Sequence, residues 1–297
     1  MHVFVTGATG FVGSAVVQEL LAHGHEVSGL VRSDAGAKAL AATGARVVRG
    51  SLEDLDSMRQ GAREADAVIH TAFNHDFSRF LENCELDRRA IDAIGNALDG
   101  STKPFVITSG LGHMEHGRLA TEDTASLPVS PAYPRASEAA AEAVATRGVH
   151  AMVVRLPPTV HGDGDHGFVP HLVNVARDKG VAAYVGDGAN RWPAVHRFDA
   201  ARVYRLAVER GSRGARYHAV TEEGVPFRDI AGTIGRELNV PVQALTPEDA
   251  AAHFAWFARF TALDVPASAA QTRAALGWED AGHPSLLDDM KAHYFHR

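Results

Sequence analysis

Cysteine is nearly absent from this sequence: Cys84 is the only one in 297 residues, so no disulfide can form within the chain. A chain without disulfides suits a reducing compartment, and we expect a cytoplasmic protein in which Cys84 is structural. The first residues, MHVFVTGATG, lack the charged segment, long apolar run and cleavage site of a secretory signal. No apolar stretch reaches the roughly 18 residues of a membrane-spanning helix. We therefore expect a soluble protein.

Basic residues are too few and too scattered for a nucleic-acid-binding surface. Lys and Arg total 29 against 36 Asp and Glu, which gives a formal net charge of -7, and no basic run occurs. Hydrophobic residues make up 45% of the chain, enough to bury a sizeable core. We expect neither nucleic acid nor a membrane surface as a partner, which leaves a small molecule.

Short apolar segments alternate with helical patterns through the first half of the chain. This rhythm predicts right-handed crossovers and a parallel sheet that is covered by helices on both faces. The expected strands are 2–6, 26–31, 46–49, 67–71, 105–109 and 151–156, and the expected helices are 12–22, 35–42, 55–63, 81–98 and 135–146. The predicted fold class is therefore α/β, a Rossmann-type doubly wound sheet.

The pattern loosens after Gly162, where HGDGDHGF and VGDGAN are typical of loops. Further on, helices are expected over 199–209 and 227–238 and a strand over 215–220. We expect 1–161 to form a dinucleotide-binding domain and 162–297 to form mainly a smaller substrate-binding lobe. Some later segments should return to the first domain.

A glycine-rich loop, Gly7-Ala-Thr-Gly10-Phe-Val-Gly13, follows the first strand and opens the first helix. Its glycines suit a tight turn, a close backbone approach to a pyrophosphate, and close helix–strand packing. The amide groups and positive dipole end of the following helix favour an anion. This context predicts a dinucleotide site.

The end of the second strand, Gly29-Leu-Val-Arg32-Ser33, indicates which dinucleotide is bound. A site selective for NAD usually places a carboxylate here for the ribose 2′-hydroxyl, whereas Asp34 comes one or two residues late. Arg32 offers a fork of donors to a 2′-phosphate, and Ser33 adds a hydroxyl. We expect NADPH (NADP+) to be favoured over NADH; the alternative is that Arg32 is only a surface charge.

Several further stretches carry a family resemblance: Gly50-Ser-Leu-Glu-Asp54, Asp66-Ala-Val-Ile-His-Thr-Ala72, Arg155-Leu-Pro-Pro-Thr-Val-His-Gly162 and Val195-His-Arg-Phe-Asp199. Together with TGATGFVG, they resemble an atypical extended short-chain dehydrogenase/reductase of the NAD-dependent epimerase/dehydratase type. The resemblance implies that the cofactor-binding residues are Gly7, Thr9, Gly10, Phe11, Val12, Gly13, Arg32, Ser33, Ser51, Leu52, Thr71, Ala72, Phe73, Pro157 and Val160.

The resemblance breaks down at the expected catalytic residues. The family pattern needs a tyrosine, a lysine four residues later and a hydroxyl at the end of the fifth strand. Tyr133 matches the tyrosine, but Ser137 stands in place of the lysine, and Gly110 in place of the hydroxyl, with Ser109 just before it. Arg135, two residues along the expected helix from Tyr133, would face another side and not simply replace the lysine.

We expect Tyr133 to donate a proton and Ser109 to supply a substrate or cofactor hydroxyl. The alternatives are an aromatic residue at a helix start, followed by Pro134 at the first helical position, and a serine with only a structural hydrogen bond. A phenol that keeps its proton can still donate it, so the missing lysine harms base-initiated chemistry more than it harms reduction.

Three residues on expected loops and strand ends are candidates for substrate binding: Asn74, His113 and His161. The segment His161-Gly-Asp-Gly-Asp-His166 holds metal-ligand residue types, but its spacing matches no closed site and we expect no metal. The sequence favours an NADPH-dependent reductase of a small carbonyl or imine. The alternatives are a nucleotide-sugar epimerase or dehydratase and a non-catalytic NADP(H)-binding regulatory protein. The alanine-rich stretch 138–145 predicts either a homodimer or close packing within the domain.

Overall fold

Seven parallel strands form the main sheet, in the order β10-β6-β5-β4-β1-β2-β3. The computed structural model describes residues 1–295. The strands are β1 (His2–Thr6), β2 (Glu26–Val31), β3 (Arg46–Arg49), β4 (Ala67–His70), β5 (Phe105–Gly110), β6 (Ala151–Leu156) and β10 (Arg216–His218). The strand order reverses between β1 and β4, which is where open sheets of this kind bind ligands at their carboxyl edge. The predicted Rossmann-type fold is confirmed.

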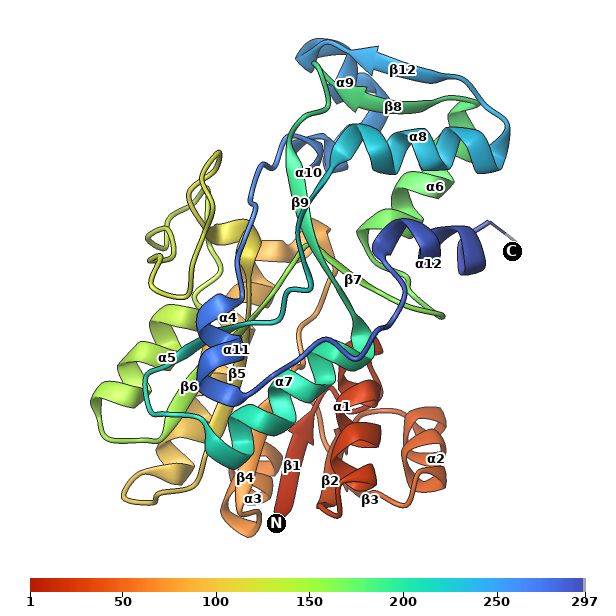
Figure 1. Ribbon diagram of the computed structural model, residues 1–297. Helices are drawn as coiled ribbons and strands as arrows, with labels where there is room; N and C mark the ends of the chain where they lie inside the picture. The colour runs from red at the N-terminus through yellow and green to blue at the C-terminus, as the bar shows by residue number, and fades with distance from the viewer. Residues whose placement is uncertain (296–297) are drawn as a thin grey trace.

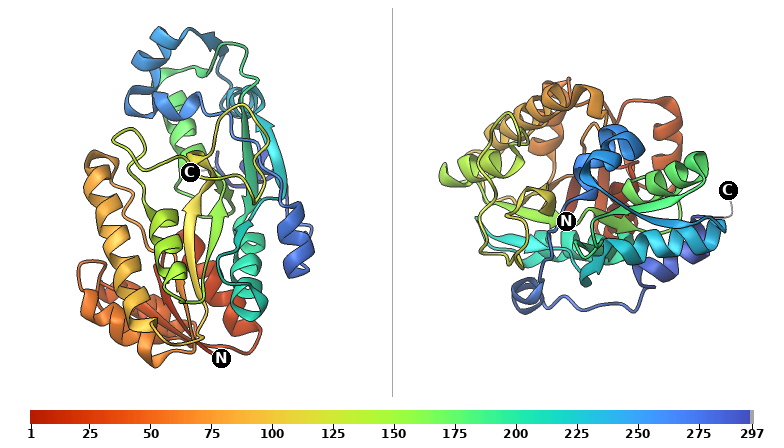
Figure 2. Two further views of the ribbon diagram at one scale, coloured as in Figure 1. Left: turned by 90° about the vertical axis from the view of Figure 1, so that its left-hand side faces the viewer. Right: turned by 90° about the horizontal axis from the view of Figure 1, so that it is seen from above.

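Helices cover both faces of this sheet because its strands are apolar on both sides (Figures 1 and 2). Val3 and Val5 lie in one core and Phe4, between them, lies in the other. The first face carries α1 (Phe11–Ala22), α2 (Asp34–Ala42), α7 (Arg197–Arg210) and α11 (Ala270–Leu276). The second face carries α3 (Leu55–Glu64), α4 (Phe80–Leu98) and α5 (Ser137–Thr146).

A smaller lobe with its own core lies over the carboxyl edge of the sheet (Figure 1). Its strands form two small sheets, β11-β9-β7 and β12-β8. They are β7 (Thr159–His161), β8 (Ala182–Val185), β9 (Arg191–His196), β11 (Glu222–Pro226) and β12 (Val242–Leu245). Its helices are α6 (Phe168–Lys179), α8 (Phe227–Leu238), α9 (Pro247–Phe254), α10 (Ala258–Thr261) and α12 (Leu286–His293). Because α7, β10 and α11 pack on the main sheet, the chain passes repeatedly between the two parts.

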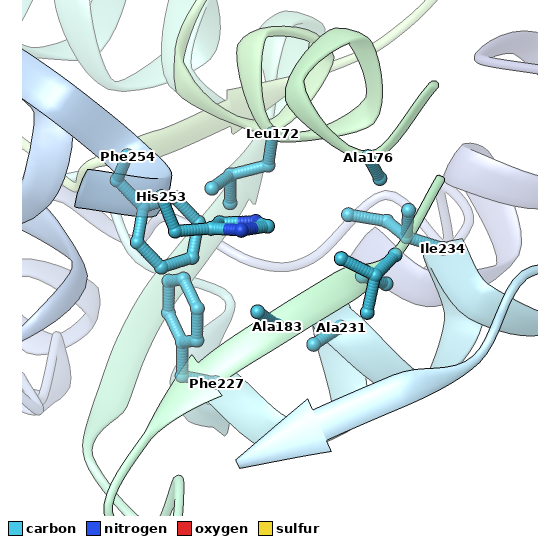
Figure 3. Close-up of a pocket in the computed structure, with 10 residues that line it drawn as sticks. Leu172, Ala176, Ala183, Phe227, Ala231, Ile234, His253 and Phe254 are labelled. Carbon is cyan, nitrogen blue, oxygen red and sulfur yellow. The ribbon is translucent and has the colours of Figure 1, made fainter. Parts of the chain in front are cut away.

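The core of the small lobe is well filled. Figure 3 shows a cavity between α6, β8 and α8 that is lined by apolar side chains and His253. Its volume is about 10 Å³, close to the space of a single water molecule. This cavity is too small for a substrate.

The predicted start of the helix before β6 is wrong. The helix expected over 135–146 begins at Ser137, so Tyr133 and Arg135 precede it. Ser130 and Tyr133 close a turn by two backbone hydrogen bonds of 3.0 Å each. Pro134 disfavours helical geometry at the residue before it. The helical spacing argument about Arg135 therefore does not apply.

Three short 3₁₀ turns complete the described elements: η1 (Phe77–Arg79), η2 (Leu111–His113) and η3 (Ala255–Phe257). None of the helices within residues 1–295 combines the length and the apolar character that a bilayer crossing requires.

Candidate functional site

The glycine loop between β1 and α1 has a backbone path that only glycine allows at two positions. Gly7 has a φ of 70°, and a Cβ there would lie 2.7 Å from the amide nitrogen of Ala72. A Cβ on Gly13 would lie 2.0 Å from the carbonyl oxygen of Gly7. The Gly10 amide donates to that same carbonyl at 2.9 Å. The loop is therefore a tight turn pressed against the start of α1.

The N-terminus of α1 suits an anion. Gly10 is the N-cap, no side chain caps the helix, and the first turn holds no acidic residue. Thr9 and Gly10 are exposed, so the amide groups at this end face outward with the positive end of the helix dipole. Phe11 and Val12 are partly buried beside them. This arrangement fits the diphosphate of a dinucleotide.

Arg197 approaches the same loop from α7, a contact that the sequence motif did not reveal. Its guanidinium lies 4.5 Å from the centre of the Phe11 ring and donates to Ser14 Oγ at 2.8 Å. The centre of the His166 ring lies 5.9 Å from that of Phe11, in an edge-to-face contact. The 162–167 loop therefore packs against the glycine loop.

The ends of β2 and β3 place charges where the adenosine half of a dinucleotide would lie. Arg32 is exposed and has no salt-bridge partner within residues 1–295. The nearby carboxylate of Asp34 is paired with Arg49 at 2.5 Å. Ser33 caps α2 by accepting the Gly36 amide at 3.1 Å. Ser51, next to Leu52, hydrogen bonds Glu53 and with the charge of Arg32 lowers the pKa of that carboxyl.

The remaining candidate cofactor residues follow β4 and β6 at the same edge. Thr71 donates to the Thr6 carbonyl at 2.8 Å and lies against Gly7 and Gly13, so it helps to fix the loop. Ala72 and Phe73 continue this segment and are partly buried. Pro157 is buried after β6, and Val160 lies partly buried in β7.

Tyr133 and Ser109 have different surroundings. Tyr133 is partly buried in the turn before α5, and its amide donates to Ser130 Oγ at 3.2 Å. Ser109 is 4% exposed on β5 and hydrogen bonds to Glu138. Glu138 in turn accepts two hydrogen bonds of 2.8 Å from buried Arg155. Ser109 therefore belongs to a buried ionic network, whereas Tyr133 lies on a loop.

The Glu138 carboxyl is ionised although it is buried. Burial raises its pKa, but the hydrogen bonds and charge of Arg155, the bond from Ser109 and the charge of Arg216 lower it further, so the net shift is downward. The paired charges link α5 to β6 inside the domain.

A chain of hydrogen bonds connects the start of α5 to β1. Arg135 Nε donates to Ser137 Oγ at 2.9 Å, and Ser137 donates to Asp87 Oδ2 at 2.6 Å. Asp87 on α4 also contacts His70 Nε2 at 3.1 Å, and His70 Nδ1 contacts Thr6 Oγ1 at 2.7 Å. Burial raises the pKa of Asp87, but bonds from His70 and Ser137 and the charges of His70 and Arg135 produce a net lowering. Asp87 could not be found from the sequence, because no local motif joins positions so far apart, and Arg135 was considered there only as a replacement for the lysine.

The guanidinium of Arg135 influences two histidines. Burial and then the Arg135 charge lower the pKa of His113, which is partly buried, to about 4. Desolvation and then the Arg135 charge also lower the pKa of His75, although this residue is exposed. Both imidazoles are therefore neutral at pH 7. His113 is a poor source of a proton there, although a neutral ring can still hydrogen bond a substrate.

The other candidate substrate residues are less open. Asn74 accepts the Asp76 amide at 3.0 Å and is partly buried. His161 is 1% exposed and contacts Asp289 of α12 through Nδ1 at 3.0 Å. Its Nε2 has no hydrogen-bond partner among the described residues.

An aromatic wall joins the segment after β4 to the small lobe. Its members are Phe73, Phe77, Phe80, Phe168, Trp256, Phe257 and Phe260. Phe257 is fully buried, whereas Trp256 stacks on Phe77 with 49% of its surface exposed. Trp192 is buried behind the wall against Phe227. Packing therefore accounts for Trp192 and Phe257, and Trp256 keeps a face toward solvent.

Metal-ligand residue types gather around the Val195–Asp199 signature. Ligand atoms of His196, Asp199 and His283 lie within 4.8 Å of one another. Asp199 already accepts the Ala281 amide and contacts His283 at 2.8 Å, while His196 accepts the Phe198 amide at the N-cap of α7. Hydrogen bonds that fasten residues 281–283 to α7 account for this group.

Comparisons with known proteins agree with the fold. Residues 3–221 match the model of the NAD dependent epimerase/dehydratase family. An uncharacterized protein of Schizosaccharomyces pombe is 48% identical over 291 residues, 98% of each chain. The 4-hydroxy-2-methyl-3-oxo-4-farnesyl-3,4-dihydroquinoline-1-oxide ketoreductase of Stigmatella aurantiaca is 29% identical over 272 residues, 85% of this chain and 79% of that one. A dTDP-glucose 4,6-dehydratase from Streptomyces venezuelae, solved with NAD bound, superposes with a TM-score of 0.78 at 22% identity, covering 99% of this chain and 96% of that one.

Proposed function

The chain belongs to the NAD-dependent epimerase/dehydratase family, as its motifs predicted, and from this premise we propose that it is an NADPH-dependent reductase of a small carbonyl or imine compound. Membership of this family supports an NAD(P)-dependent oxidoreductase. The choice of NADPH, the direction of reaction and the catalytic residues are our proposals. A ketoreductase among the relatives supports reduction.

The observation that carries the choice of NADPH is that, of two neighbouring charged residues, Asp34 has an ionic partner and Arg32 has none within the described chain. The exposed Asp34 carboxylate forms a surface ion pair with Arg49, whereas Arg32 has no salt bridge within the described chain. An exposed guanidinium without a salt bridge attracts a 2′-phosphate and offers little to a bare 2′-hydroxyl. Arg32 and Ser33 would hold this phosphate, and the α1 amide groups would hold the diphosphate.

Bound NADPH supplies a hydride. The residues of this chain must then hold the substrate and provide one proton. We assign the proton to the Tyr133 hydroxyl, since His113 is neutral and Ser109 is engaged with Glu138. Asn74 and His113 are assigned to hydrogen bonding the substrate, with the aromatic wall on the side of the small lobe. His161 is buried, so it would influence the substrate only through the residues that lie in front of it.

The test is turnover of NADPH with a panel of aldehydes, ketones, cyclic imines and nucleotide sugars, followed by the loss of NADPH absorbance. We expect consumption with carbonyl or imine compounds only. Conversion of nucleotide sugars without net loss of NADPH, followed by chromatography of the products, would favour an epimerase or dehydratase, because these reactions return the hydride to the sugar. Tight NADPH binding without turnover on any member would instead favour a non-catalytic, NADP(H)-responsive protein.

A Tyr133→Phe variant tests the assignment of the proton donor. Loss of a positioned acid typically costs 10²- to 10⁴-fold in rate, so we expect a loss of about that size in kcat with an unchanged Kd for NADPH. Turnover equal to that of the parent enzyme would remove Tyr133 from the mechanism and leave a water near Ser109 as the donor.

The homodimer remains a proposal. Val144 of α5 packs where Gly95 of α4 has no side chain, so some of the small residues serve packing within the domain. Ala139, Glu142 and Ala143 of α5 are exposed and offer a face for a second copy. Light scattering would show the mass of two chains, and an Ala143→Arg variant would show one.

A further inference from the structure

We propose that Arg135 binds an acidic group of the substrate, so that the substrate is an oxo acid, a carbonyl compound that also carries a carboxylate. The inference rests on the proposed reductase function and adds a substrate class to it.

Arg135 differs from most of the partly or fully buried arginines of this protein and shares its lack of a salt bridge with Arg197 and Arg273. Arg155, Arg191 and Arg205 each form a salt bridge with a carboxylate at 2.9 Å or less. Arg135 is also partly buried, but it forms no salt bridge within residues 1–295. A charge that is withdrawn from water without an ionic partner is costly, and such a charge usually has a partner. A ligand can provide that partner.

The guanidinium of Arg135 is held in a fixed place. Its Nε donates to Ser137, which is bonded to the buried carboxylate of Asp87. Its flat face lies 4.2 Å from the centre of the Phe73 ring. The two contacts fix the plane of the group, while the terminal nitrogens have no hydrogen-bond partner among the described residues. A fork that is already oriented loses little freedom when a carboxylate binds it with two parallel hydrogen bonds.

The surroundings of the fork leave an anion without a competitor. His75 and His113 are neutral at pH 7, so neither offers a second cation that would bind the anion in place of Arg135. Both oxygens of Asp87 are engaged, one with Ser137 and one with His70. Phe73 belongs to the segment assigned to the cofactor, so an acid bound by Arg135 would lie beside that segment.

The rival assignment is that Arg135 replaces the missing lysine and holds the nicotinamide ribose. The two assignments predict different losses when the charge is removed. A substrate receptor affects acids only. A cofactor contact weakens NADPH and lowers activity on acidic and neutral substrates alike.

The experiment compares oxo acids with their methyl esters in the complete protein. Binding to the NADP+ complex is followed by tryptophan fluorescence, and the Kd of NADPH and the turnover of each pair are measured separately. The variants are Arg135→Met, Arg135→Lys and Arg259→Met. Arg259 is a matched control, because it also lies over an aromatic ring, that of Phe260 at 4.7 Å, and is exposed.

The parent enzyme should bind oxo acids about 10- to 100-fold more tightly than their esters, the range of a charge-assisted hydrogen-bonded pair. Arg135→Met should remove this preference without changing the Kd of NADPH, Arg135→Lys should recover part of it, and Arg259→Met should keep it. Equal affinity of the parent for acids and esters, or an equal loss of NADPH affinity in Arg135→Met, would overturn the inference.

Failure of the proposed function has a different signature. Turnover of neutral ketones without any preference for acids defeats this inference and leaves the reductase standing. A lack of turnover on every compound defeats the reductase. Binding of acids that depends on Arg135 would still support the anion receptor in that case.

Discussion

Replacing Arg32 with alanine should separate the affinities for the two dinucleotides. Arg32 is exposed at the end of β2 and is tied to no carboxylate in the described chain, so its removal disturbs little of the fold. Ser33 keeps its role as the cap of α2, and the Asp34–Arg49 pair is unchanged. The substitution therefore removes one positive charge and its fork of donors.

The expected size follows from the charges involved. A phosphate monoester carries about -1.5 to -2 charges at neutral pH. Two unit charges about 4 Å apart attract by about 1 kcal/mol in water and about 4 kcal/mol near a protein surface. Hydrogen bonds to charged groups contribute about 1.5–3 kcal/mol, so the Kd of NADPH should rise roughly 10- to 150-fold. The Kd of NADH should change by less than about twofold, because a neutral 2′-hydroxyl gains little from the guanidinium.

Calorimetric titration of both dinucleotides into the parent and variant proteins measures the four constants. Arg46→Ala is the matched control: it removes an exposed arginine at the start of β3, the opposite end of the sheet, and should leave both constants unchanged. The difference should shrink at high salt, because the phosphate contact is screened. Equal weakening of NADPH and NADH in Arg32→Ala would refute the reasoning on specificity.

Three further predictions concern the loop and the buried charges. Gly13→Ala should abolish measurable dinucleotide binding in calorimetry and lower stability by about 1–3 kcal/mol, because the new Cβ would lie 2.0 Å from a backbone oxygen. Gly232→Ala is the control: the new Cβ would have only a flexible side chain near it, at 3.5 Å, so this variant should bind the dinucleotide normally. Glu138→Ala leaves buried Arg155 without its partner and should lower the unfolding free energy by about 3–5 kcal/mol in urea, whereas a loss below about 1 kcal/mol would contradict a buried pair. The pKa values of Glu138 and Asp87 are lowered in the folded state, so stability should fall as the pH drops below about 4.5 and through these folded-state pKa values. Denaturation curves without a steeper loss of stability in that range would argue against these ionised groups.

Much of the large sheet could be predicted because its signals are local. β1, β2, β3 and β6 have the predicted bounds, since continuous apolar runs between turn residues define buried strands. The start of α5 was predicted two residues early, because alanine content favours helix there while Pro134 and the Ser130–Tyr133 turn delay it. The strands of the small lobe, β7, β8, β9, β11 and β12, were not predicted from their short and uneven patterns.

The candidate site was predicted only in part, because the sequence shows its residues but not which of them pair in space. Asp34 could be read from the sequence, but its pairing with Arg49 could not, since the two residues lie 15 positions apart. Ser137 was interpreted as the loss of a lysine. In the structure it links Arg135 to Asp87, which lies 50 positions earlier in the chain.

By itself, the sequence determined the Rossmann sheet, the glycine turn at α1 and the presence of Arg32 beside it, because each depends on residues that are neighbours in the chain. Only the tertiary structure decided which charges are neutralised and which are left without a partner. Arg32 and Arg135 look like ordinary arginines in the sequence. Only the structure shows that neither arginine has a salt bridge within the described residues, since electrostatic pairing depends on distance in space and not on separation along the chain.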